Sequence, residues 1–208
     1  MLSDPAFLVF CTATLAMAVS PGPAAICMAA QGSANGWQRA GAGTLGILVA
    51  NLVFFVLSAT GIAVLLLASH LVFSVIKWCG VAYLLYLSVK FLTARGGFRY
   101  EPGRVAPLRS LFTQGLVVQL SNPKALLYFT AILPQFVQPG EAVAMQVLWL
   151  GVAKALIDLV VYTAYSAFGQ GVARSGLRAS TVRAVNSFAG GALLFAAWKM
   201  AFTSAKRA

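Results

Sequence analysis

Long apolar runs separated by short polar segments dominate the chain. Six of these runs are long enough to cross a bilayer as helices, which takes about 20 residues at ~1.5 Å each. They cover residues 5–28, 42–68, 71–93, 112–137, 143–169 and 184–203, which is most of the 208 residues. The pattern predicts an all-α integral membrane protein with six transmembrane helices.

Two of the runs, the first and the fourth, are interrupted by short polar segments that contain proline. These segments are residues 20–23 (Ser-Pro-Gly-Pro) and residues 121–124 (Ser-Asn-Pro-Lys). Proline removes a backbone donor and clashes with the preceding turn, so each helix must bend or open there. In lipid the freed backbone groups are tolerated only where they face protein or a water-filled cavity. Paired breaks in the two halves therefore predict broken first and fourth helices that form a transport site.

The runs also predict an internal duplication. Matching positions follow the same order in the two halves, and they pair Ser20 with Ser121, Asn51 with Asp158, and Leu84 with Leu193. Since each half holds three spans, an odd number, the second copy enters the membrane in the opposite direction. We therefore predict a 3+3 inverted-topology repeat within one transmembrane domain. Its parts are a first copy over residues 1–95, a cytoplasmic connecting loop over 96–110 and a second copy over 111–208.

Composition and charge favour a membrane protein over a protein that binds nucleic acid. The chain is 60% hydrophobic and only 9% charged, with a mean hydropathy of +0.85, whereas a soluble domain needs a polar shell. The net charge of +11 comes largely from arginines in or beside three connections that six spans place on one side: Arg39, Arg95, Arg99, Arg104, Arg109, Arg174, Arg178 and Arg183. Because cytoplasmic loops carry the Lys and Arg excess, we predict that both termini lie outside the cytoplasm. Lys206 and Arg207 at the C-terminus oppose this orientation.

Residue types that serve enzymes and metal sites are scarce. No Cys-x-x-Cys pair occurs, and the few candidates lie in apolar runs or at a junction between runs: Cys11, Cys27, Cys79 and His70. The sequence contains no phosphate-binding glycine loop, nucleophile elbow or metal-ligand spacing. We therefore expect no enzyme activity, no metal, no cofactor and no ATP-driven transport by this chain alone. The alternatives from other classes are an intramembrane enzyme, which would have to use Asp158 and Lys154, and a channel built on the same broken helices.

Two motifs, one in each half, resemble those of a known family. The first is Ser-Pro-Gly-Pro at 20–23, followed by Gln31-Gly32 and by glycines at 41, 43 and 46. The second is Asn-Pro-Lys-Ala at 122–125, followed by Leu-Pro-Gln-Phe at 133–136. On these motifs, and over essentially its whole length, the chain resembles the lysine-exporter (LysE/RhtB-type) amino-acid exporters.

The resemblance implies a multi-pass efflux protein of the bacterial inner membrane. Such a protein exports amino acids or close derivatives and is driven by the proton gradient. Export of an inorganic ion or another small metabolite on the same scaffold is the alternative function. The expected partners are the lipid bilayer, protons and a small amino-acid substrate, and exposed faces of small residues permit a homodimer.

Asp158 is the only acidic residue deep within a predicted helix. Placing a charge there costs about 3 kcal/mol on insertion scales, so a functional reason is expected. Lys154 lies one turn away on the same helix, at a spacing that permits an ion pair. We predict that Asp158 and Lys154 serve proton coupling, and a purely structural ion pair is the alternative.

The two breaks supply groups that suit an amino-acid zwitterion. Backbone amides around Gly22, at the start of a half-helix, attract a carboxylate through the helix dipole. The Lys124 ammonium offers a second partner for that carboxylate, unless its stem carries the amine to an interface. Gln119 adds a neutral donor and acceptor, and Asp158 or backbone carbonyls suit the substrate ammonium. The predicted substrate-binding residues are Pro21, Gly22, Pro23, Ala24, Asn51, Asn122, Pro123 and Lys124.

Overall fold

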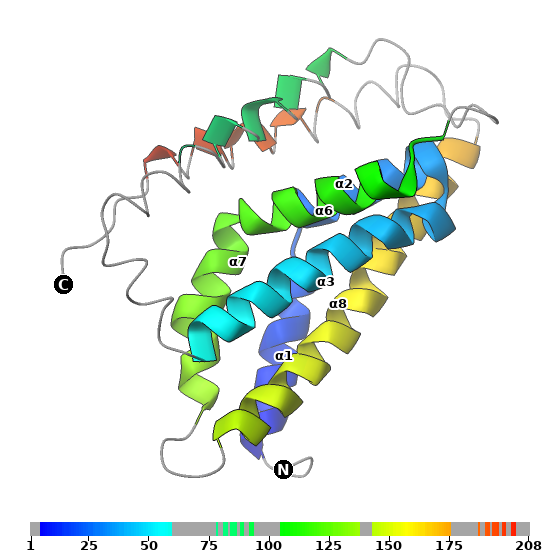
Figure 1. Ribbon diagram of the computed structural model, residues 1–208. Coiled ribbons are helices and arrows are strands. Elements are labelled where there is room, and N and C mark those ends of the chain that lie inside the picture. Colours follow the sequence, from blue (N-terminus) through cyan, green and yellow to red (C-terminus); the bar gives the residue numbers. More distant parts are fainter. Residues whose placement is uncertain are drawn as a thin grey trace.

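The computed structural model describes three continuous parts of the chain, residues 5–59, 105–137 and 143–175. It also describes single residues and short stretches of the third and sixth predicted runs: 78, 81–82, 84–86, 88–89, 92–93, 187, 190–191, 193–195, 197–198 and 201–202. All regular secondary structure within these parts is helical (Figure 1), as the apolar runs predicted. The six-span inverted repeat extends beyond them and stays a prediction.

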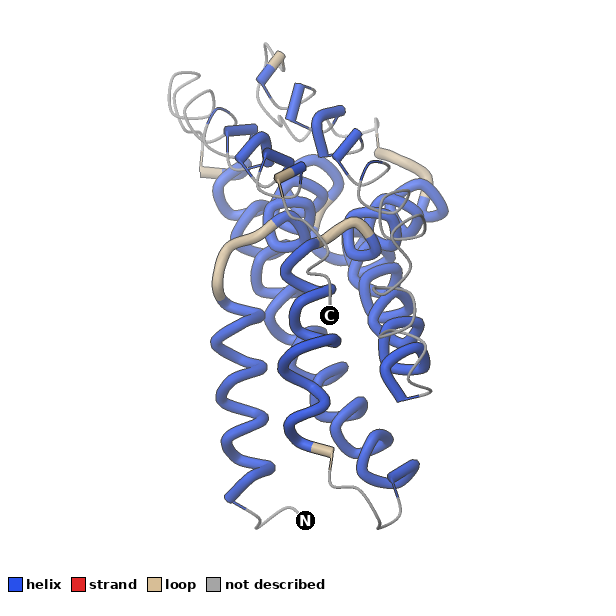
Figure 2. Tube along the Cα trace, turned by 90° about the vertical axis from the view of Figure 1, so that its left-hand side faces the viewer, coloured by secondary structure: helices blue, strands red, loops and turns tan. Residues whose placement is uncertain are grey.

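The first predicted run folds as two helices that meet at a bend (Figure 2). α1 spans Pro5–Val19 and α2 spans Pro23–Asn35, with a bend of 58° between them. Pro23 occupies the first position of α2, where a missing N–H costs nothing because first-turn donors have no partner within a helix. Gly22, just before it, is extended. The predicted break in the first helix is confirmed.

α2 continues to Asn35, past residue 28, where the predicted run ends. Its last turns carry polar side chains, and these are buried with partners. The Gln31 side-chain amide donates to the Leu111 carbonyl at 3.1 Å, and the Asn35 side-chain oxygen accepts the Ala106 N–H at 2.7 Å. Hydropathy therefore marks the end of the apolar residues, whereas the helix ends where Gly36 adopts a φ of 82°, which glycine tolerates best.

The fourth predicted run is also broken. α6 spans Leu108–Leu120 and α7 spans Pro123–Leu127. Asn122 lies between them and caps α7, because its Oδ1 accepts the backbone N–H of Lys124 at 3.1 Å. The cap satisfies one of the donors that the start of a helix leaves free. This confirms the predicted break in the fourth helix.

Two unbroken helices cross the molecule between the broken ones. α3 spans Trp37–Ala59 and α8 spans Val143–Arg174. Residues Trp37–Ser58 and the whole of α8 are long and apolar enough to cross a membrane, and the bent pair of α1 and α2 qualifies as a third span if it is counted as one. These correspond to three of the six predicted spans. The third and sixth predicted spans fall largely outside the described residues.

The described helices meet at two opposite ends of the molecule (Figure 1). At one end the start of α3, the start of α6 and the end of α8 converge, and the side-chain oxygen of Gln170 accepts the Trp37 N–H at 2.8 Å. Arg39, Arg109 and Arg174 lie in these terminal turns, so we call this the arginine end.

α7 passes at the opposite end into a π-helical turn, η1 (Tyr128–Ile132), and a 3₁₀ turn, η2 (Leu133–Phe136). The start of α1 packs against them, with the rings of Phe10 and Phe136 5.3 Å apart. We call this the aromatic end, and its rings are those of Phe10, Phe54, Phe55, Tyr128, Phe129 and Phe136.

Helix backbones come into direct contact where the helices cross near the arginine end. Glycines at these crossings face backbone atoms of the neighbouring helix, so an added Cβ would overlap them. They are Gly32 and Gly169 between α2 and α8, and Gly46 and Gly115 between α3 and α6. Small residues permit this close approach, which is how helices gain packing energy in a membrane. The crossings hold the two broken helices against the two unbroken ones and so position the groups between them.

Candidate functional site

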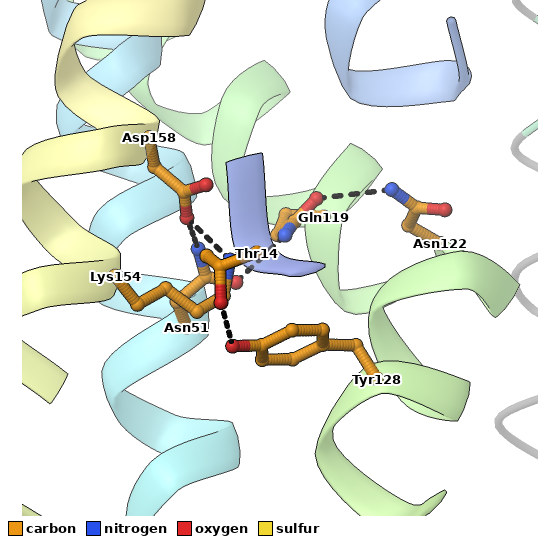
Figure 3. Close-up of polar contacts among 7 residues, drawn as sticks. All are labelled: Thr14, Asn51, Gln119, Asn122, Tyr128, Lys154 and Asp158. Carbon is orange, nitrogen blue, oxygen red and sulfur yellow. Dashed lines mark hydrogen bonds and ion pairs between the residues drawn. The ribbon is translucent and has the colours of Figure 1, made fainter. Parts of the chain in front are cut away.

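A buried ion pair lies at the centre of the described helices (Figure 3). The Lys154 ammonium is 2.7 Å from Oδ2 of Asp158, and the exposed fractions of the two residues are 7% and 0%. The i, i+4 spacing on α8 places both side chains on one face of that helix. The predicted pairing of these two residues is therefore observed, and their role in proton coupling is taken up below.

A chain of side-chain amides connects this ion pair to the second break. Asn51 on α3 donates from Nδ2 to Oδ2 of Asp158 at 2.6 Å. Gln119 on α6 donates from Nε2 to Oδ1 of Asn51 at 2.6 Å, and Asn122 donates from Nδ2 to Oε1 of Gln119 at 3.1 Å. Figure 3 shows these side chains one after another in space, from Asp158 on α8 to Asn122, the cap of α7. Four of the predicted site residues, Asn51, Asn122, Lys154 and Asp158, thus belong to one hydrogen-bonded network.

The first break is held by side chains from the second half of the chain. Tyr165 on α8 donates its hydroxyl hydrogen to the Val19 carbonyl at 2.6 Å. Lys124 donates from Nζ to the Ser20 carbonyl at 2.5 Å. These are carbonyls that lose their helical partners where α1 stops, so both carbonyls are satisfied within the protein. Lys124 therefore joins the two breaks, an arrangement that its position in the sequence did not reveal.

The other predicted residues line the breaks without polar side chains. Pro23 and Pro123 each open a helix, and Ala24 is buried in the first turn of α2. A Cβ on Gly22 would come within 3.5 Å of the Lys124 side chain, so the glycine backbone lies beside the lysine stem. Unlike α7, α2 has no side-chain cap. Its first amides are consequently the groups of the first break that suit an anion.

A further hydrogen bond, on the side of the ion pair that faces the aromatic end, was not predicted from the sequence. The hydroxyls of Thr14 on α1 and Tyr128 on η1 are 2.7 Å apart and buried. The Lys154 ammonium also lies over the Tyr128 ring, 4.6 Å from its centroid, a cation–π arrangement. Thr14 and Tyr128 carry no distinguishing signal in the sequence, because both stand within ordinary apolar runs.

Asp158 retains one oxygen without a partner. Among the residues that the structure describes, no donor lies within hydrogen-bonding distance of its buried Oδ1. An ionised carboxylate can accept at both oxygens, so this side chain has capacity for a proton or for a ligand ammonium. Nor does any group of three His, Cys, Asp or Glu residues suited to a metal occur in the described part of the chain.

Charged side chains lie buried in this molecule, while many large apolar side chains are exposed on its outside. Asp158 and Lys154 are buried, whereas Leu52, Val160 and Phe168 are 62%, 68% and 68% exposed. Soluble proteins show the opposite distribution of charged residues. A fold of apolar helices around a buried ion pair defines a helical membrane protein with an intramembrane polar site.

Comparison with known proteins identifies the family. A family model described as "LysE type translocator" matches residues 15–204. The chain therefore belongs to the LysE type translocator family, and the resemblance carried by its two break motifs is confirmed.

Named relatives cover most of the chain. A homoserine/homoserine lactone efflux protein of Salmonella typhi is 30% identical over 168 residues, which are 80% of this chain and 81% of the relative. The protein of the same name from Salmonella typhimurium is 31% identical over the same shares. A leucine efflux protein of Salmonella choleraesuis is 24% identical over 121 residues, 56% of each chain. No solved structure matches the chain significantly.

Proposed function

We propose that this chain is a secondary transporter of the bacterial inner membrane that exports amino acids or close derivatives. It works by alternating access and is coupled to protons. The observation that carries the proposal is the buried ion pair of Lys154 and Asp158, hydrogen-bonded through amides to the break in the fourth helix. The names of the relatives, which refer to efflux of homoserine, homoserine lactone and leucine, support the class of substrate.

Asp158 is the proton carrier in this proposal, and Lys154 is its ionic partner. Oδ2 already accepts from Lys154 and Asn51, which stabilises the ionised carboxylate. When Asp158 takes up a proton, Lys154 keeps the contact with the Tyr128 ring that it already makes. Lys154 therefore has a partner whether Asp158 is ionised or protonated, which a group that exchanges protons in each cycle requires.

The substrate binds at the two breaks, between the first turn of α2 and the cap of α7. Free amides around Gly22 and the Lys124 ammonium suit its carboxylate. Asn51 and Asn122 orient it, and Pro21, Pro23, Ala24 and Pro123 shape the backbone around it. Lys124 already contacts the Ser20 carbonyl of the first break, so one side chain reaches both sides of the substrate site.

The arginine end faces the cytoplasm in this proposal. Arg39, Arg109 and Arg174 gather there, and basic residues are enriched on the cytoplasmic side of membrane proteins. With six spans this orientation leaves both termini in the periplasm. Everted vesicles, whose cytoplasmic face is outside, will then take up the substrates that cells export.

The test is uptake of a labelled amino-acid panel, including homoserine and leucine, into everted vesicles with and without an imposed proton gradient. Wild type is expected to show saturable uptake that depends on the gradient. Asp158→Asn keeps the size of the side chain and removes the titratable group, so gradient-driven uptake should fall to the level of vesicles without the protein. Ser166→Ala is the matched control, because Ser166 is buried on the same helix and its hydroxyl bonds, among the described residues, to the Tyr162 carbonyl of its own helix.

Three results would overturn parts of this proposal. Gradient-driven uptake that survives Asp158→Asn would remove Asp158 as the carrier and leave the exporter. Absence of uptake for every amino acid, in vesicles shown to contain the protein, would replace the amino-acid substrate by an inorganic ion or another metabolite. Uptake that does not saturate would indicate a channel.

A further inference from the structure

We propose that Gln119 is a positioning residue that couples the protonation of Asp158 to the cap of α7. It does so as the middle member of a relay of three side-chain amides, Asn51, Gln119 and Asn122 (Figure 3). The inference rests on the proposed proton-coupled export and adds how the proton is linked to the substrate site.

Both ends of the relay impose the same direction on its hydrogen bonds. At the α7 end, Oδ1 of Asn122 accepts the Lys124 N–H, so its Nδ2 must face Gln119. At the other end, an ionised Asp158 can only accept, so Asn51 must present its Nδ2. Gln119 satisfies both neighbours at once by accepting at Oε1 and donating from Nε2. Every donor in the relay therefore points toward Asp158.

Burial makes the relay act as a unit. Asn51, Gln119 and Asn122 are only 4%, 2% and 4% exposed. If one amide turned alone, it would bring two donors or two acceptors face to face, away from water that could replace the lost bond. Unpaired buried polar groups are costly, and linked hydrogen bonds strengthen one another. The three amides consequently keep one direction or reverse together.

Protonation of Asp158 supplies the reason to reverse. The proton bonds to a carboxylate oxygen and stays there, so no other bond in the relay is made or broken covalently. Oδ1 has no hydrogen-bond partner among the described residues, and the relay bonds to Oδ2 alone, so a hydroxyl at Oδ1 would gain no bond from the relay. A hydroxyl at Oδ2 faces Asn51 and can donate to the Asn51 side-chain oxygen, provided that the Asn51 amide turns. Gln119 and then Asn122 must turn in response.

The last turn in the relay removes the helix cap. Once Asn122 offers its oxygen to Gln119, its Nδ2 faces the Lys124 N–H, and two donors cannot bond. The start of α7 is then released, together with the lysine that holds the Ser20 carbonyl of the first break. In this way protonation of one carboxyl on α8 changes both breaks.

Other charged and titratable groups lie close enough to Asp158 to interact with it electrostatically. They are Lys154 on the same helix, Lys124 at the second break, and the hydroxyls of Tyr128 and Tyr162. Lys154 can remain over the Tyr128 ring when the carboxylate is neutralised. None of these groups connects Asp158 to Asn122 through hydrogen bonds, so Gln119 is the link.

The test compares two activities of the same everted vesicles, with labelled homoserine and leucine as probes. One is uptake driven by the proton gradient, and the other is exchange of labelled for unlabelled substrate without a gradient. Gln119→Leu keeps a side chain of similar size and removes the link. The ratio of driven uptake to exchange should fall about fivefold or more, the equilibrium effect expected of one lost N-cap, while exchange persists. Gln114→Leu is the matched control, because Gln114 lies on the same helix and bonds to Ser110 outside the relay.

A second variant separates the relay from a general structural role. Asn122→Ser can still cap α7, but its hydroxyl is too short to reach Gln119. The exchange rate of this variant is the reference for its driven uptake. The ratio of driven uptake to exchange should again fall below that of wild type. A ratio equal to wild type in either variant would overturn the relay, and so would loss of exchange in both, because a positioning residue must be dispensable for exchange. Wild-type vesicles without any gradient-driven uptake would instead overturn the export proposal, and the relay with it.

Discussion

At the arginine end the helices touch through their backbones, whereas at the aromatic end they touch through rings. Gly32 and Gly169 bring α2 and α8 together so closely that a single Cβ would overlap a carbonyl. At the aromatic end Phe129 packs edge-on against Phe55 at 4.9 Å and stacks with Phe54 at 5.3 Å. The polar network lies between the two kinds of packing.

The difference indicates how each end can open. Backbone contacts cannot be relieved by side-chain rotation, so the arginine end separates only if whole helices move. Ring contacts can change when side chains adopt other rotamers, with smaller displacement of the backbone. Alternating access in the proposed exporter would therefore combine a rigid movement on one side with a side-chain rearrangement on the other.

The largest effect is expected from removing a ring at the aromatic end. Phe129→Ala deletes a fully buried side chain that contacts Phe54, Phe55 and Tyr128, and should lower the free energy of unfolding by about 3–5 kcal/mol. Thermal unfolding of the detergent-solubilised protein would measure it. Phe168→Ala on the exposed side of α8 is the control and should have little effect. Equal losses in the two variants would mean that the ring cluster is not a packed core.

A smaller loss is expected from adding one carbon at the arginine end. Gly169→Ala places a Cβ against the Ala29 carbonyl, so α2 and α8 must move apart at a cost of about 1–3 kcal/mol. Gly171→Ala is a close control, because no atom of the described residues lies within 4 Å of the Cβ that it adds. The melting temperature of Gly169→Ala should be lower than that of Gly171→Ala. If Gly169→Ala were as stable as Gly171→Ala, the backbone contact would not hold the arginine end together.

The smallest effect concerns the hydrogen bond beside the aromatic rings. Thr14→Val keeps the shape of the side chain and leaves the buried Tyr128 hydroxyl without its partner, which should cost about 1 kcal/mol. Thr12→Val is the control on the same helix, since Thr12 is bonded only to its own helix backbone. The free energy of unfolding, measured in parallel for the two variants, would show whether this bond stabilises the aromatic end. A larger loss in Thr12→Val would contradict the assignment.

The breaks could be predicted from the sequence because their cause is local. Proline and glycine at residues 20–23, and an N-cap followed by proline at 122–123, end and restart a helix wherever the chain folds. The Lys154–Asp158 pair follows from spacing along one helix. Asn51 and Asp158, which the predicted repeat pairs with each other, lie in direct contact.

The remaining contacts depend on packing that a pattern does not encode. No sequence motif distinguishes Tyr165 or Gln170, yet they bond to Val19 and Trp37 in the other half. Lys124 was expected to face a substrate or an interface, and it bonds to the Ser20 carbonyl. Each of these partners is set by where two distant helices cross, so only the three-dimensional arrangement identifies it.

The way the first break is satisfied has a consequence for how the protein is made. The carbonyls of Val19 and Ser20 receive their hydrogen bonds from Tyr165 and Lys124, which the ribosome adds more than a hundred residues later. Until then these two carbonyls of the first half lack the partners that they have in the folded chain, and each would cost several kcal/mol if it faced lipid. Synthesis therefore passes through an incomplete intermediate that the second half finishes. For the same reason, the two halves produced as separate chains would be stable in the membrane only as a pair.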